Sequence, residues 1–113
     1  MIRTIDLFAG VGGIRLGAEA ALKRHGIDSK CVLSSEINEK ACETYQLNFG
    51  EHPCGDIHEI SEIEPFDFLL GGFPCQPFSY AGKRKGFGDT RGTLFFEIER
   101  ILQKYQPKAF LLE

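Results

Sequence analysis

Short apolar runs alternate along the chain with longer segments in which apolar residues recur at helical spacing. The apolar runs predict strands. The third run is almost continuously apolar, which is typical of a strand buried on both faces of a parallel sheet. We expect the last run to begin another buried strand. The predicted strands are residues 4–8, 30–35, 66–70 and 109–113.

Three intervening segments predict helices. The first begins after the glycines at 10–13 and ends near Gly26, and the second is capped by Asn38 and runs to about Asn48. The third has Asp89 or Thr90 as its cap and ends before Pro107. The residues expected on their apolar faces are Ile14, Ala18, Ala21 and Leu22, then Ala41, Cys42, Tyr45 and Phe49, and finally Leu94, Phe95, Ile98, Ile101, Leu102 and Tyr105.

Alternating strands and helices predict an α/β fold, a Rossmann-like open parallel sheet with flanking helices. Ligands of such sheets bind beyond the carboxyl ends of the strands. We expect five strand ends to meet there, those of the four runs above and one before Asp56, and the sheet to be incomplete because the chain stops as its fifth strand begins. The residues predicted at these ends are the loop 8–13, Glu36, Asp56, Cys75 and Glu113.

Composition changes this picture little. The chain has 113 residues, 42% hydrophobic and 26% charged, with a net charge of −3, which fits one globular domain. It has no apolar run near the about 20 residues that a membrane helix needs, and no signal peptide. We therefore expect no membrane partner, and a location in the bacterial cytoplasm, or in the nucleus if the source is eukaryotic. Without a secretory signal the four cysteines are expected to be free thiols in a reducing compartment, and without a C-x-x-C pair no metal site is expected.

One cysteine lies in an unusual setting. Cys75 follows a buried strand and stands between Pro74 and Pro77 in the sequence GGFPCQPFS. Because proline restricts its own backbone and that of the preceding residue, this loop is stiff. Such a loop suits a nucleophile, although the residues alone also allow a thiol that only packs as a small apolar group.

A basic, glycine-rich stretch follows Cys75. It contains Lys83, Arg84, Lys85 and Arg91. Lysine and arginine contacts dominate affinity for a nucleic-acid backbone, so this stretch either follows phosphates or is a solvated loop.

The first loop and the second strand predict a nucleotide-type ligand. Gly10, Gly12 and Gly13 open a helix, and Glu36 follows the second strand, where an acidic residue commonly binds ribose hydroxyls. However, Arg15 stands where the dinucleotide fingerprint requires its third glycine. An adenosine ligand without a pyrophosphate therefore fits better than NAD.

Two motifs in register resemble the cytosine-5 DNA methyltransferase family. Residues 6–13 (DLFAGVGG) are similar to its S-adenosylmethionine loop, and residues 72–79 (GFPCQPFS) to its proline–cysteine nucleophile loop. Glu36, residues 55–57 (GDI) and residues 92–95 (GTLF) fall in the family order. The resemblance covers essentially residues 1–113 and identifies them as the N-terminal part of the family's catalytic domain.

The resemblance implies a role for each matched residue. The cofactor would be S-adenosyl-L-methionine, converted to S-adenosyl-L-homocysteine, and the substrate double-stranded DNA. Cys75 would be the nucleophile, and Glu113 would bind the target cytosine. Cofactor contacts would come from Phe8, Ala9, Gly10, Gly13, Glu36 (ribose), Ile37 (adenine face), Asp56 (adenine amino group), Ile57, Pro74 and Leu94. DNA contacts would come from Gln76, Ser79, Lys83, Arg84, Lys85 and Arg91.

The resemblance also implies what lies beyond residue 113: the remaining catalytic motifs and the target-recognition domain. We therefore expect little activity from this chain alone, and possible dependence on a second polypeptide that supplies those parts. Three other interpretations stay open: RNA cytosine-5 methylation, a non-catalytic cofactor-binding or regulatory fragment, and a nicotinamide-dependent oxidoreductase, which the broken glycine pattern disfavours.

Overall fold

The computed structural model describes residues 1–72 and 90–113, and the side chains of residues 90–93 lie outside that description. The chain divides into two compact units, residues 1–72 with 107–113 and residues 73–106. The elements in chain order are β1 (Ile2–Leu7), α1 (Gly13–Arg24), β2 (Ser29–Ser35), α2 (Glu39–Phe49), a 3-10 turn η1 (Ile57–Glu59), β3 (Phe68–Gly71), α3 (Thr90–Tyr105) and β4 (Ala109–Leu112).

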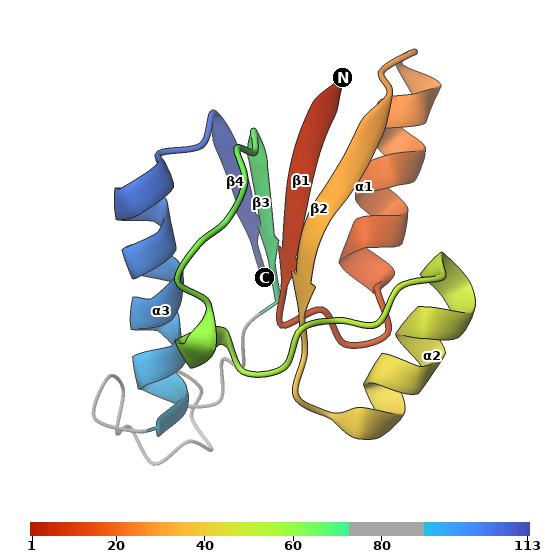
Figure 1. Ribbon diagram of the computed structural model, residues 1–113. Helices are drawn as coiled ribbons and strands as arrows, with labels where there is room; N and C mark the ends of the chain where they lie inside the picture. The colour runs from red at the N-terminus through yellow and green to blue at the C-terminus, as the bar shows by residue number, and fades with distance from the viewer. Residues whose placement is uncertain (73–89) are drawn as a thin grey trace. The chain divides into compact units, whose positions relative to one another are not determined.

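The strands form one parallel sheet in the order β2-β1-β3-β4 (Figure 1). β1 is interior, and its residue Asp6 pairs with Ser34 of β2 on one side and Leu70 of β3 on the other. Helix α1 contacts β2 and β3, and α2 begins just after the carboxyl end of β2. The predicted α/β fold with a parallel sheet is therefore confirmed.

The segment before Asp56 differs from the prediction. It forms a single bridge between Cys54 and Ser35, so Asp56 does not follow a strand of the sheet. Cys54 donates its N–H to Ser34 O at 2.8 Å and accepts from Glu36 N at 2.9 Å. Pro53 has no N–H to add a further rung. Within the described residues the sheet thus has four strands, and the expected count of five was wrong.

The last strand is also different from the prediction. In β4 the residues Ala109, Phe110 and Leu111 are exposed, with 56% of Phe110 and 49% of Leu111 accessible. Among the strands that the structure describes, β4 pairs with β3 alone and is therefore an edge of the sheet. The prediction of a buried strand was wrong because apolar composition does not show what covers a strand.

The helices occur where the sequence placed them. The Asn38 side chain caps α2 by accepting from Ala41 N at 2.9 Å, and Gly50, at φ 74°, ends that helix. In α1 the apolar face is less buried than expected: Ala21 is exposed, and the buried residue is Arg15. In α3, which belongs to the second unit, Ile98 and Ile101 are fully buried.

None of the helices in the described ranges has the length and apolarity that crossing a bilayer requires.

Candidate active site

The loop after β1 has an unusual backbone. Phe8, Gly10 and Gly12 adopt positive φ angles of 53°, 57° and 94°. Positive φ is common for glycine but uncommon for a bulky aromatic residue such as Phe8, and strained backbone of this kind concentrates at functional sites. Among the described residues, a Cβ placed on Gly10 or Gly13 would meet no atom within 4 Å, so none of these residues fills the space beside either glycine. This loop can therefore receive a ligand against its backbone.

Gly12, in contrast to Gly10 and Gly13, has no space for a side chain. A Cβ at this position would collide with the ring of Phe49 and lie 3.2 Å from the ring of Tyr45. Helix α2 therefore packs directly against the backbone at the start of α1, and only glycine fits between them.

Glu36 joins the first loop to the second strand. Its Oε1 accepts from Gly10 N at 2.8 Å, and its Oε2 accepts from Asn38 N at 2.9 Å. A carboxylate has further lone pairs on both oxygens, so these bonds orient it and leave capacity for ligand hydroxyls. The predicted acidic residue at the end of β2 is thus held beside the glycine loop.

Asp56 reaches the same edge through the Cys54 bridge. Ser35 Oγ donates to Gly55 O at 2.8 Å, which ties the segment to the end of β2. The Asp56 side chain caps η1 by accepting from His58 N at 2.9 Å and makes a 2.6 Å contact with His58 Nδ1. The backbone bond first, and the ring bond second, hold the pKa of the Asp56 carboxyl below its ordinary value. Asp56 is therefore an ionised, exposed acceptor.

The two isoleucines predicted beside adenine have different environments. The Ile37 side chain is 70% exposed, so it is free to lie against a flat ring. The Ile57 side chain is 3% exposed and packs in the core, so little beyond its backbone can meet a ligand.

The ends of β3 and β4 complete this edge. Gly72 donates its N–H to Leu7 O at 3.2 Å, and a Cβ there would lie 3.1 Å from Ile14 Cδ1. Glu113 donates its N–H to Gly71 O at 2.9 Å, which places it at the carboxyl end of β4. Glu113 and Gly72 therefore leave the sheet side by side on neighbouring strands.

Several predicted site residues lie in the second unit or outside the described residues. Leu94 is half-buried in α3 of the second unit, and Arg91 lies in the first turn of α3 with its side chain outside the description. The others fall outside the described residues: Pro74, Cys75, Gln76, Ser79, Lys83, Arg84 and Lys85.

A buried polar network beneath the loop was missed at the sequence level. Arg15 donates from Nη1 to Tyr45 Oη at 2.9 Å, and Tyr45 Oη donates to Asp6 Oδ2 at 3.0 Å. Arg15 also pairs with Glu19 at 2.8 Å and with Glu51. Burial raises the pKa of Asp6 to about 6, against a smaller lowering by the Tyr45 bond. The available signal was an acidic residue, Asp6, directly between the apolar residues Ile5 and Leu7 of a strand.

The same arginine supports the loop through a second contact. Its guanidinium carbon lies 4.3 Å from the centroid of the Phe49 ring, the ring that abuts Gly12. A cation above an aromatic face is attracted to it. Arg15, which stands in place of the third glycine of the dinucleotide fingerprint, is therefore directed toward α2, where it holds the Phe49 ring against Gly12.

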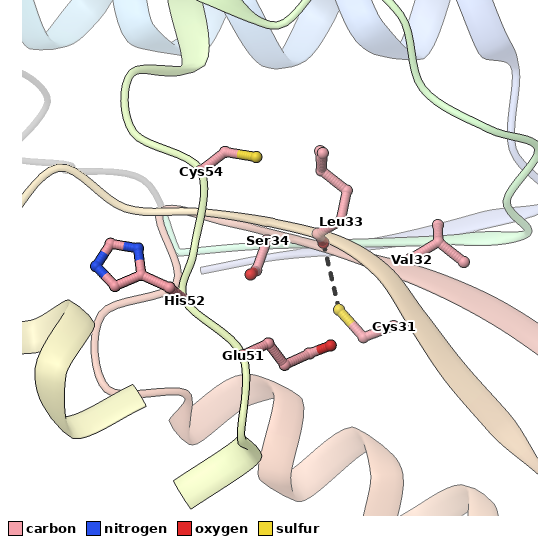
Figure 2. A pocket seen from close by; sticks show the side chains of 7 residues that line it. All are labelled: Cys31, Val32, Leu33, Ser34, Glu51, His52 and Cys54. Atoms are coloured by element: carbon pink, nitrogen blue, oxygen red, sulfur yellow. Dashed lines mark hydrogen bonds between the residues drawn. The ribbon is translucent and has the colours of Figure 1, made fainter. Parts of the chain in front are cut away.

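Two of the three described cysteines do not resemble a nucleophile. Cys31 and Cys42 are buried, and burial raises the pKa of both thiols, which keeps them protonated. Cys31 and Cys54 line a cavity of about 150 Å³. Figure 2 shows that their thiols do not face each other and that the Cys31 thiol is hydrogen-bonded to Leu33 O, at 3.3 Å. In the portion of the chain with described side chains, no cluster of His, Cys, Asp and Glu could hold a metal.

The comparisons with known proteins agree with this geometry. Residues 2–113 match the family model described as C-5 cytosine-specific DNA methylase. The chain is 70% identical to Type II methyltransferase M.BanI of Aneurinibacillus aneurinilyticus over 99% of its own length and 26% of that protein. It is 66% identical to Type II methyltransferase M.HgiCI of Herpetosiphon aurantiacus over 100% of its length and 27% of that protein.

Solved structures support the same assignment. The S. pombe Dnmt2 methyltransferase superposes with a TM-score of 0.68 and 26% identity, over 99% of this chain and 35% of that one. The chain thus spans about a quarter of the curated relatives named above and about a third of this structure. Because the family model covers nearly every residue, the chain belongs to the C-5 cytosine-specific DNA methylase family.

Proposed function

We propose that this chain is the N-terminal catalytic portion of a DNA (cytosine-5-)-methyltransferase. The observation that carries the proposal is the placement of Glu36 and Asp56, two acceptors from separate segments, at one strand end beside a glycine loop whose backbone no other described side chain covers at Gly10 and Gly13. Membership in the C-5 cytosine-specific DNA methylase family supports methyl transfer to cytosine as the reaction.

The cofactor in this proposal is S-adenosyl-L-methionine, which supplies an electrophilic methyl group. Glu36 would accept from the ribose hydroxyls, and Asp56 from the adenine amino group. Phe8, Ala9, Gly10 and Gly13 would bound the methionine portion. Ile37 would cover one face of the adenine, and Ile57 would contribute through its backbone. Pro74 and Leu94 are the remaining proposed cofactor contacts.

The nucleophile in this proposal is Cys75. Its thiolate would form a bond to C6 of cytosine, which moves the ring electrons toward C5 and makes C5 able to attack the methyl carbon. Glu113, placed at the end of β4, would hydrogen-bond N3 and stabilise the charge that develops in this addition. A base then removes the C5 proton, and the C6–sulfur bond breaks to release the thiolate.

The nucleic-acid partner is proposed to be double-stranded DNA with the target cytosine flipped out of the stack, because C5 and C6 are not accessible inside a duplex. Lys83, Arg84, Lys85 and Arg91 would contact phosphates, and Gln76 and Ser79 would lie near the flipped base. The relatives are about four times longer than the matched region, which favours dependence on further sequence, in the same protein or in a second polypeptide.

Covalent trapping tests the proposal. A duplex containing 5-fluorocytosine should form a denaturation-resistant complex with the full-length protein in the presence of S-adenosylmethionine. The complex should be absent for Cys75→Ser and retained for Cys54→Ser, the exposed control thiol. Trapping of a matched RNA in place of the duplex would favour RNA methylation. Cofactor binding without trapping of either polymer would favour a non-catalytic role.

A further inference from the structure

His58 makes two contacts with one oxygen of Asp56. The backbone N–H of His58 donates to Asp56 Oδ1 at 2.9 Å, and the ring Nδ1 lies 2.6 Å from the same atom. Both side chains are about half exposed, at 46% and 47%. A carboxylate oxygen only accepts, so the ring contact requires the proton on Nδ1.

These two contacts hold the Asp56 carboxylate through a single oxygen, Oδ1. The backbone bond alone would allow the group to rotate about its terminal torsion, which is a broad and soft one. The ring bond removes that freedom. Among the described residues, Asp56 Oδ2 accepts no hydrogen bond, so it remains available for a ligand.

The available oxygen, Asp56 Oδ2, can distinguish between purines that differ in their exocyclic group. An ionised carboxylate accepts hydrogen bonds and cannot donate one. A purine with an exocyclic amino group can therefore bond to Oδ2, whereas a purine with a carbonyl at the same place would set two acceptors against each other. The loss of a hydrogen bond in such a site produces strong discrimination.

We propose that His58 is a positioning residue that holds the Asp56 carboxylate with Oδ2 toward the exocyclic amino group of the cofactor, and thereby sets the preference for adenine over hypoxanthine. The proposal rests on the cofactor assignment above. It adds to that assignment a residue that does not touch the ligand but sets the ratio of the affinities for the adenine and hypoxanthine ligands.

The test compares two ligands by calorimetric titration of the full-length protein: S-adenosylhomocysteine and S-inosylhomocysteine, which has a carbonyl in place of the amino group. The unsubstituted protein should prefer the adenine ligand. His58→Ala should lower the ratio of the two affinities by about tenfold, mainly by weakening the adenine ligand. His58→Asn should restore the ratio, because the Asn amide places an N–H near the position of Nδ1.

A further variant tests whether the preference for adenine depends on the accepting character of Asp56. Asp56→Asn carries an amide that can donate to a carbonyl, so it should remove or reverse the preference. Equal weakening of both ligands by His58→Ala would overturn the inference, since it would mean that His58 only supports the local fold. An unchanged ratio, or failure of His58→Asn to restore it, would also overturn the inference.

The result for the unsubstituted protein separates this inference from the proposed function. Binding of S-adenosylhomocysteine with an unaltered ratio in His58→Ala contradicts only the role of His58. Absence of binding by the unsubstituted protein contradicts the cofactor assignment and the inference together.

Discussion

The backbone N–H of Gly10 donates to Oε1 of Glu36 at 2.8 Å, across 26 residues of sequence. This bond closes the loop after β1 onto the end of β2, and the second carboxylate oxygen, bonded to Asn38 N, fixes the start of the connection to α2. A residue expected to bind ribose therefore also shapes the loop that would bind the rest of the cofactor. The proposed ribose contact and the observed geometry of the loop therefore depend on the same carboxylate.

Replacing Glu36 with Gln should weaken S-adenosylhomocysteine binding by tenfold or more and reduce the free energy of unfolding by about 1–2 kcal/mol. The amide oxygen can replace only one of the two acceptors, so its NH₂ group would face either Gly10 N–H or Asn38 N–H. Calorimetry and urea unfolding measure the two effects. Glu43→Gln, at an exposed position of α2, is the control and should alter neither.

Gly12→Ala should be strongly destabilising, by about 3 kcal/mol or more, because the added Cβ meets the Phe49 ring and the residue has a positive φ of 94°. Gly17→Ala adds the same methyl group within α1, where it would contact no described residue beyond the neighbouring helix backbone, and should stabilise by up to about 1 kcal/mol. Thermal unfolding of both variants provides the comparison. Similar melting temperatures would show that the Phe49 ring moves freely, against the packing described here.

Asp6 should make stability depend on pH. Its folded pKa of about 6 lies above the ordinary value of 3.8, so its protonated form is favoured in the folded state. Its contribution is fully present below about pH 4 and is lost as the pH rises through about 6, a change on the order of 3 kcal/mol.

Asp6→Asn isolates this contribution, because the amide oxygen still accepts from Tyr45 but the side chain cannot ionise. The difference in unfolding free energy between the two proteins, measured in urea from pH 4 to pH 7.5, should change in favour of Asp6→Asn as the pH rises. A constant difference across this range would mean that Asp6 has an ordinary pKa in the folded protein.

Tyr45→Phe should destabilise by about 1–3 kcal/mol, since it keeps the packed ring but removes the hydroxyl that links Arg15 to Asp6. The substitution leaves a buried guanidinium N–H with one acceptor fewer. Leu47→Ala on the same helix changes a side chain that is 86% exposed and should alter stability by less than about 0.5 kcal/mol. Equal effects of the two substitutions would argue against a network of this strength.

Much of the fold could be predicted because its signals are local. The glycines before α1, the Asn38 cap and the apolar period of α3 each act within a few residues, and the structure has these elements where the sequence places them. The motifs at residues 6–13 and 72–79 likewise indicated the family that the whole-chain comparison supports.

Other features could not be predicted because they depend on partners distant in sequence. The apolar run at β4 does not reveal that it is a sheet edge, and Pro53 alone does not reveal that Cys54 pairs only once. The contact between Asp56 and His58 spans two residues, yet it depends on the η1 turn.

The sequence by itself determined the order of the helices and of the four strands along the chain, the glycine loop, and the positions of Glu36 and Glu113 after their strands. Only the tertiary structure decided that Arg15 is buried, because its stabilising partners, Tyr45 and Glu51, are 30 and 36 residues away. A charge can be buried only where other groups satisfy it, and a linear pattern of polar and apolar positions does not say which groups will meet.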